Sequence, residues 1–492
     1  MLFIDKNHEK NYSTVDRTAD TKPLLPRFWN RLSQTVALTC VTACVAVYAL
    51  SVYSLVNLHS HFSDDTTPFS TSEKTPPVIS PATSVAHNNA STYAKELAQI
   101  DRQLSAKKAF AAAHPDSELH LTKVAEAYFE RARLSGEFTD YASALNTLQS
   151  VFAMEDHGNG PVLLRARLNY SLHRLPSIEP DLLTAQSALL VNKPTNAKIE
   201  GIRADVSLQQ GQYDNALQTY EELDKNHPDS TSAIRIAHAN AYTGDHAVAE
   251  HWFAVAENRA PLRSSQLRSW LALQLGILDL ERGRLDEALV HYQRALELFP
   301  GYWLVEEHIA EIDALQGRTD KAEHAYRDLI NRTGSPQFMI ALADILLQRD
   351  GLENNEATEL LEQANHVFTS MASQIPEAIA GHALEYFLQQ GNPKQALQLA
   401  MDNYRLRAGG PSAVLLAQAH AINGQLSEAS TVLDKLLTTP YRSADLHATA
   451  GVVYRASGFN DRADHQEQLA RTINPGAVES NDWLWVGIEA IN

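Results

Sequence analysis

Carboxylate side chains recur at one position of a repeated sequence pattern, six residues before a glycine or, before Gly351, seven. The residues at this position are Asp205, His238, Ile277, Glu311, Asp344, Glu385, Gln418 and Val452. Four of these eight are acidic, and Glu307 adds a carboxylate one helical turn before Glu311. Carboxylates form charge-assisted hydrogen bonds with lysine and arginine. The pattern therefore indicates electrostatic binding of a basic partner, which needs no cofactor.

Common catalytic and metal-binding motifs are absent from the sequence. There is no GxSxG, HExxH, CxxC, GxGxxG or phosphate-loop pattern, and Gly158–Gly160 precedes Pro161 in an expected loop instead of following a strand. His59, His61, Asp64 and Asp65 match no defined metal-ligand spacing and are better explained as a solvated segment. We predict that the protein is not an enzyme and binds no metal or cofactor.

The glycines belong to a degenerate repeat that is anchored by alanines. The alanines follow one another at intervals of 33 to 39 residues, and a glycine stands five or six residues before each. They are Ala216, Ala249, Ala288, Ala322, Ala357, Ala396, Ala429 and Ala463. The clearest copy, residues 269–300, has a small residue at Gly276, a turn at Gly283 and a helix stop at Pro300. Each unit is expected to be a pair of helices.

These units resemble tetratricopeptide repeats, whose pattern is Leu-Gly, an aromatic, Ala-x3-aromatic and Pro. The aromatics four residues after the alanine are Tyr220, Phe253, Tyr292 and Tyr326. The later units depart from the pattern at Leu361, Ala400, Leu433 and Glu467. The resemblance implies an all-α, right-handed superhelical solenoid.

In that family the first helix of each pair lines a concave groove, and the position described above points into it. The resemblance therefore implies a partner-binding groove lined by Asp205, His238, Glu307, Glu311, Asp344, Glu385 and Gln418. Its partner would be a protein segment bearing Lys or Arg. The alternative is that an acidic protein simply has acidic surfaces everywhere.

The repeats divide the chain into segments. The array is expected over residues 118–475, as nine or ten helix pairs, with its clearest part at 197–475 and a capping or linking helix at 92–117. The two 39-residue intervals predict insertions in the turns between units, around residues 263–266 and 368–374. Repeat packing must supply the stability, since both cysteines, Cys40 and Cys44, lie upstream of the array.

Residues 34–58 are expected to form a transmembrane helix, because residues 36–56 contain no charge and are long enough to span a bilayer. Arg27 and Arg31 precede the helix and no basic residue follows until Lys74, so residues 1–33 should be cytoplasmic. A cleaved signal would be shorter. A lipoprotein signal at Cys44 would not continue into twelve further apolar residues.

The charge of the chain divides at this helix. Residues 1–33 carry six basic and four acidic side chains; the chain's net charge is −18, so the remainder carries −20. Residues 59–91 are rich in Ser, Thr and Pro and should form an extended tether. A strongly acidic exported part excludes a nucleic-acid partner, which would need a basic surface.

The last segment, residues 476–492, is apolar for a chain terminus and carries Trp483 and Trp485. Because a solenoid must cover its last apolar face, this segment is expected to be a C-terminal cap. The alternative is a docking tail that uses the tryptophans as anchors for a partner.

These features predict a membrane-anchored scaffold for protein interactions in an envelope assembly, such as pilus, secretion or cytochrome biogenesis. The alternative is a dedicated, non-catalytic regulatory subunit of one membrane enzyme, such as a polysaccharide synthase. The expected location is the bacterial inner membrane with the repeats in the periplasm. Glycosylation sequons at Asn89, Asn169 and Asn331 leave a eukaryotic lumen open. The sequence specifies neither the partner nor the oligomeric state.

Overall fold

The computed structural model describes residues 91–154, 160–187, 193–351, 353–389 and 392–489. The predicted cytoplasmic segment 1–33, transmembrane helix 34–58 and almost all of the 59–91 linker lie outside these ranges. Among the residues that are described, no helix is both long enough and apolar enough to cross a membrane.

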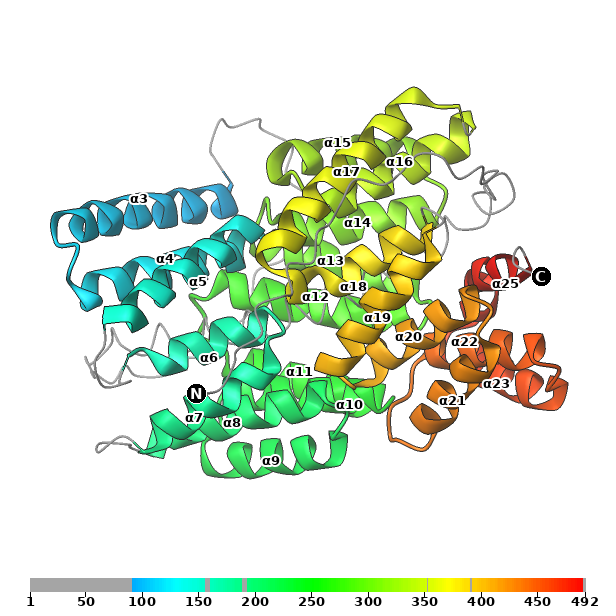
Figure 1. Ribbon diagram of the computed structural model, residues 1–492, viewed down its shortest axis with the longest axis horizontal. Coiled ribbons are helices and arrows are strands. Elements are labelled where there is room, and N and C mark those ends of the chain that lie inside the picture. Colours follow the sequence, from blue (N-terminus) through cyan, green and yellow to red (C-terminus); the bar gives the residue numbers. More distant parts are fainter. Residues whose placement is uncertain (1–90, 155–159, 188–192, 352, 390–391, 490–492) are drawn as a thin grey trace, which may run out of the picture.

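The described chain is all-α, and its helices follow one another as pairs (Figure 1). The first helix is α3 (Thr92–Ala113). The pairs are α4 (Glu118–Ser135) and α5 (Phe138–Met154), α6 (Val162–Ser171) and α7 (Ile178–Ser187), α8 (Lys193–Gln209) and α9 (Tyr213–Asn226), α10 (Ser230–Tyr242) and α11 (His246–Arg259), α12 (Ser265–Glu281) and α13 (Leu285–Leu298), α14 (Trp303–Leu315) and α15 (Thr319–Thr333), α16 (Pro336–Asp350) and α17 (Asn355–Gln374), α18 (Pro376–Gln389) and α19 (Pro393–Leu406), α20 (Gly410–Ile422) and α21 (Leu426–Leu437), and α22 (Ala444–Ala456) and α23 (Asn460–Ile473). The short helices α24 (Ala477–Ser480) and α25 (Asp482–Glu489) follow, and a 3-10 turn, η2 (Leu175–Ser177), precedes α7.

Close packing within a pair depends on small residues on the first helix. At Gly276 in α12, an added Cβ would stand 2.2 Å from Cε1 of Tyr292 in α13. The Tyr292 ring is fully buried there, and the pair turns at Gly283, whose φ of 71° favours glycine. The alanine and glycine pattern of the sequence therefore sets the distance between the paired helices.

Gly276→Ala is expected to destabilise the protein by about 1–3 kcal/mol, because the new methyl group overpacks against the Tyr292 ring. Gly381→Ala in α18 is the matched control, because the nearest atom to its added Cβ is 3.6 Å away. The control should be neutral or slightly stabilising, as alanine favours a helix more than glycine does. Thermal melts of both variants check this; equal losses would contradict the packing argument.

Both long repeat intervals lengthen a helix, and in the first of them residues 263 and 264 lie in the turn before that helix, as predicted. Residues 368–374 lie inside α17, which has 20 residues, so the prediction of an insertion in the following turn was wrong. Around 263–266, Ser265 and Gln266 already belong to α12, which has 17 residues. The added residues continue the helical hydrogen bonds because Phe368 and Met371 bury their side chains at helical spacing.

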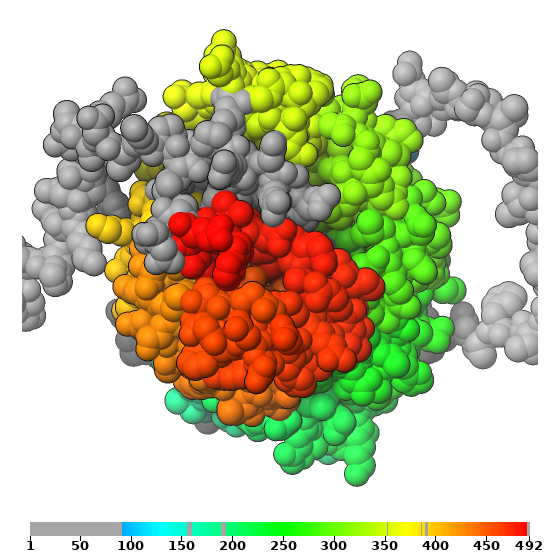
Figure 2. All heavy atoms as spheres, turned by 90° about the vertical axis from the view of Figure 1, so that its right-hand side faces the viewer, coloured from blue at the N-terminus to red at the C-terminus, as the bar shows by residue number. Residues whose placement is uncertain are grey.

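The solenoid curls until early pairs contact pairs much later in the chain. The Gly410 amide donates to the Tyr213 hydroxyl (2.6 Å), and the Arg442 amide donates to the Tyr242 carbonyl (3.0 Å). Figure 2 shows the C-terminal helices flanked by helices from the middle of the chain. We call this line of contacts the seam; in it, residues about 200 positions apart meet. The first helix of each pair therefore faces an interior that is enclosed by other pairs of the array.

Further seam contacts join the first pairs of the array to pairs later in the chain. Nε1 of Trp303 donates to the Leu134 carbonyl (3.1 Å), and Arg174 forms an ion pair with Glu377 (3.0 Å). Tyr93 at the start of α3 stacks on Tyr302, with 6.1 Å between ring centroids. α3 thus packs along α4 and, through its first residues, also contacts the middle of the array.

The C-terminal helix α25 packs on α20 and α22, the first helices of the last two pairs. Trp483, Leu484 and Ile488 join the same apolar cluster as Val452. Trp483 is 7% exposed, whereas Trp485 is only partly buried at the edge of the cluster. This placement favours the cap over the docking tail.

Trp483→Ala is expected to destabilise the last pairs by about 3 kcal/mol, because it removes a large buried side chain. Trp485→Ala is the control and should cost clearly less. Deleting residues 480–492 should cost at least as much as Trp483→Ala, since it removes the whole docked helix. Melting curves of the three variants test the cap; an unchanged melting temperature after the deletion would favour the docking tail.

Candidate functional site

The candidate site is the row of first-helix residues that the sequence pattern singles out. In α10, α14, α16, α20 and α22 this position is the ninth residue of the helix. His238, Glu311, Asp344, Gln418 and Val452 are all at most 9% exposed there. The side chain of Glu385 in α18 lies outside what the structure describes. The row is a buried line along the inner helices and not an acidic, solvated surface.

Asp205 is engaged inside the protein. Its two carboxylate oxygens accept hydrogen bonds from Nε and Nη2 of Arg235, each at 2.8 Å, and the Tyr220 hydroxyl donates to it at 2.9 Å. Both Asp205 and Arg235 are buried. We therefore correct its assignment: Asp205 joins α8 to α10 and does not present a carboxylate to a partner.

Gln418 is likewise engaged. Its amide nitrogen donates to the Thr449 hydroxyl (3.0 Å) and to Asp445 (3.3 Å). Asn481, which directly precedes α25, donates to the same Asp445 oxygen at 3.3 Å. The C-terminal segment thus covers this end of the row. The prediction that Gln418 lines a partner-binding groove is therefore corrected as well.

His238 is a buried, neutral histidine. Its ring lies 5.2 Å from Phe253 and 5.8 Å from Trp270, measured between centroids. Burial lowers the pKa of His238 to about 4, so the imidazole carries no charge near neutral pH. Its Nε2 has no hydrogen-bond partner in the described structure.

Glu311 and Asp344 are the two buried acids of the row whose carboxyl oxygens have no hydrogen-bond partner in the described structure. Burial raises the pKa of Asp344 to about 8. Burial, and next the charge of Glu307, raises the pKa of Glu311 well above its usual value. With a pKa of about 8, Asp344 is mostly protonated at neutral pH, which corrects the picture of an anionic groove at this position.

Glu307 has a partner within its own helix. Its Oε2 lies 2.6 Å from Nδ1 of His308, and that nitrogen is also 2.9 Å from the Leu304 carbonyl. Glu307 is 7% exposed. It therefore adds a buried carboxyl group beside Glu311, as its spacing of one helical turn predicts.

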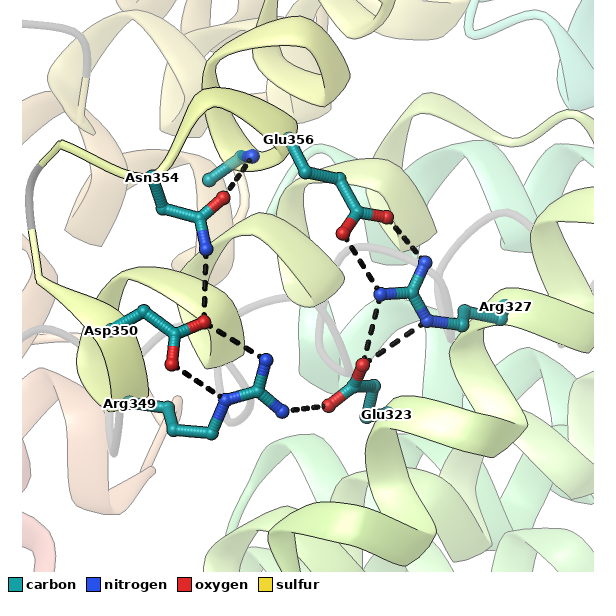
Figure 3. A network of polar contacts seen from close by, with 7 residues as sticks. Glu323, Arg327, Arg349, Asp350, Asn354 and Glu356 are labelled. Atoms are coloured by element: carbon teal, nitrogen blue, oxygen red, sulfur yellow. Dashed lines mark hydrogen bonds and ion pairs between the residues drawn. The ribbon is translucent and has the colours of Figure 1, made fainter.

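Charged groups on α15, on α17 and at the C-terminal end of α16 form a separate network (Figure 3). Arg327 of α15 binds Glu323 in its own helix (2.9 Å) and Glu356 of α17 (3.0 Å). Hydrogen bonding from Arg327 lowers the pKa of Glu356. Arg349 bridges Glu323 and Asp350. These side chains connect successive pairs, and much of the chain's charge is used in this structural way.

Sequence reasoning missed Arg235 and the seam. The available signal for Arg235 was a basic residue on an otherwise apolar face of α10, thirty residues after Asp205. The seam offered no such signal, because its contacts use backbone groups and residues about 200 positions apart.

The fold and the inner row define an all-α helical-repeat solenoid, a class that binds partners along its helices. Tetratricopeptide repeat family models match residues 203–230 and 269–294. These two segments are tetratricopeptide repeats, as the alanine and glycine pattern predicts. Such repeats serve as scaffolds for protein interactions, and catalysis is not typical of them.

One curated relative is the cellulose synthase 1 operon protein C of Komagataeibacter xylinus, 26% identical over 286 residues. The match covers 56% of this chain but 19% of that protein, so the chain spans about a fifth of the relative's length. Among solved structures, a tetratricopeptide repeat protein from Parabacteroides merdae is 19% identical, with 55% of this chain and 99% of that chain covered and a TM-score of 0.32. Yeast Tom70 is 15% identical, with 76% and 87% covered and a TM-score of 0.32.

Proposed function

We propose that this protein is a membrane-anchored, extra-cytoplasmic scaffold that gathers protein components of an envelope assembly such as a pilus or secretion machine. The observation that carries the proposal is the row of buried first-helix carboxyl groups, Glu311 and Asp344, which have no partner within the described chain. The predicted span 34–58 would hold the array at the inner membrane, with the repeats in the periplasm.

The inner row suits a partner that brings lysine or arginine. A buried carboxyl group gains most from a cation when water is excluded, because the effective dielectric is low. The cation also offsets the cost of burying the ionised acid. The partner proposed here is therefore a protein with an exposed basic segment.

Capture of partners by the full chain in mild detergent tests the scaffold. Glu311→Gln, Asp344→Asn and Glu385→Gln together should abolish capture while the melting temperature changes little or rises, because no buried charge is introduced. Glu287→Gln with Glu359→Gln, both exposed on second helices, form the control and should leave capture intact. Capture that survives the inner substitutions would exclude the inner row as the binding surface.

A second candidate is a dedicated subunit of one membrane enzyme, such as a polysaccharide synthase. The similarity to the cellulose synthase 1 operon protein C favours it. The same purification separates the candidates: a subunit should recover one stoichiometric partner, whereas a scaffold should recover several substoichiometric ones.

A further inference from the structure

The interior between α12, α13 and α14 holds a concentration of buried oxygen atoms. Burial, and then the charges of Glu311, Glu307 and Glu281 in that order, hold the pKa of the Tyr292 hydroxyl well above its usual value. Glu281 lies in α12, and Glu307 and Glu311 lie in α14; both helices pack against α13, which carries Tyr292. Tyr292 itself is fully buried, and its hydroxyl has no hydrogen-bond partner in the described structure.

Packing fixes the direction of that hydroxyl. The Tyr292 ring lies over Gly276, where no side chain blocks it, and its centroid is 5.3 Å from the His308 ring of α14. The ring therefore passes between α12 and α14, from the second helix toward the inner helices that carry Glu311. The hydroxyl and the Glu311 carboxyl are thus buried oxygen groups on two helices that pack against each other, and neither has a hydrogen-bond partner in the described structure.

Within the described residues, no lysine or arginine forms an ion pair with Glu311 or Glu307. Neither carboxyl oxygen of Glu311 has a partner in the described structure, and the basic group facing Glu307 is His308 of the same helix. Arg282, which follows Glu281, is engaged with Asp279 (2.9 Å) and with Glu250. An unpaired buried carboxyl group is unfavourable, and a buried cation paired with it would offset that cost.

We propose that Glu311, Glu307 and the Tyr292 hydroxyl form a binding site for one organic cation, the ammonium or guanidinium group of an inserted side chain. This inference rests on the scaffold function proposed above and specifies how the basic partner is held. The donors of an ammonium group match carboxylate and hydroxyl acceptors converging from two helices. Burial raises the pKa of Glu311, and a cation bound beside it lowers that pKa again, so binding favours the release of a proton to solvent.

Titration of the full chain in mild detergent with a fluorescent glycine–serine peptide containing lysine tests the site. The lysine peptide should bind, and the same peptide with acetylated lysine should not, because acetylation removes the charge. Glu311→Gln and Tyr292→Phe should each weaken binding about tenfold, the loss of roughly one charge-assisted hydrogen bond. Calorimetry in two buffers of different ionisation enthalpy should show proton release in the wild type and less in Glu311→Gln.

Glu287→Gln, an exposed change on α13, is the control and should leave affinity unchanged. Spermidine provides a second arm: if it binds more tightly than the peptide, and Glu311→Gln weakens it, the site accepts a free polyamine instead of a partner's side chain. Equal binding of the acetylated peptide, or undiminished lysine binding in both Glu311→Gln and Tyr292→Phe, would overturn the site. Partner capture that persists in Glu311→Gln would also overturn it while leaving the scaffold function intact.

Discussion

Asp344→Asn is expected to stabilise the protein increasingly as the pH rises from about 4 to about 8. Asp344 is 6% exposed and its carboxyl oxygens have no partner in the described structure. Burial raises its pKa from the usual 3.8 to about 8 in the folded protein. The folded state therefore holds a proton that the unfolded chain releases above pH 4.

The direction in which stability changes with pH follows from this difference in bound protons between the folded and unfolded states. The wild type keeps its full stability below pH 4 and loses it as the pH rises through the folded pKa of about 8. The loss is about 1.4 kcal/mol per pH unit between those values, on the order of 4 kcal/mol from pH 5 to pH 8. Asparagine has no titrating proton, so the unfolding free energy of the Asp344→Asn variant should lack this pH dependence.

Chemical unfolding of the wild type and Asp344→Asn at several pH values measures the effect. Glu359→Gln, an exposed change on α17, should follow the wild-type pH profile. Parallel profiles for the wild type and Asp344→Asn would show that Asp344 is solvated or paired in the folded protein.

Arg235→Met is expected to destabilise the protein by about 3–5 kcal/mol, because it leaves the buried Asp205 carboxylate without its cation. The pair has ideal two-point geometry, with both contacts at 2.8 Å. It also joins α8 to α10, so its loss weakens the interface between successive pairs on which a solenoid depends.

The double variant Arg235→Met with Asp205→Leu should recover most of this loss, since apolar side chains of similar volume can replace a buried pair. Arg327→Met is the control: its ion pairs are exposed, so it should cost under about 1 kcal/mol. Denaturant midpoints check all three variants. The Arg235 guanidinium also packs against Gly201, where an added Cβ would stand 2.2 Å from Nη1. A double variant as unstable as Arg235→Met would show that this packing, and not the unpaired carboxylate, determines the loss of stability.

The repeated unit could be predicted because its determinants are local. Helix turns at glycines such as Gly283 and close contacts at small residues such as Gly276 depend on residues a few positions apart. The resemblance likewise predicted that Glu311 and Asp344 occupy equivalent inner positions. It could not predict that Asp205 is neutralised, because Arg235 belongs to the next unit and its partner is decided by packing.

The sequence by itself determined an all-α array of tetratricopeptide repeats, the apolar segment 34–58 and the positions of the inner residues. Only the tertiary structure decided how far the array curls, that α25 covers Gln418 and that Glu311 and Asp344 are buried with no hydrogen-bond partner in the described part of the chain. The physical reason is the separation along the sequence of the residues that make the deciding contacts. A helix pair is specified by contacts within about forty residues, whereas curvature accumulates over many pairs and brings together residues about 200 positions apart.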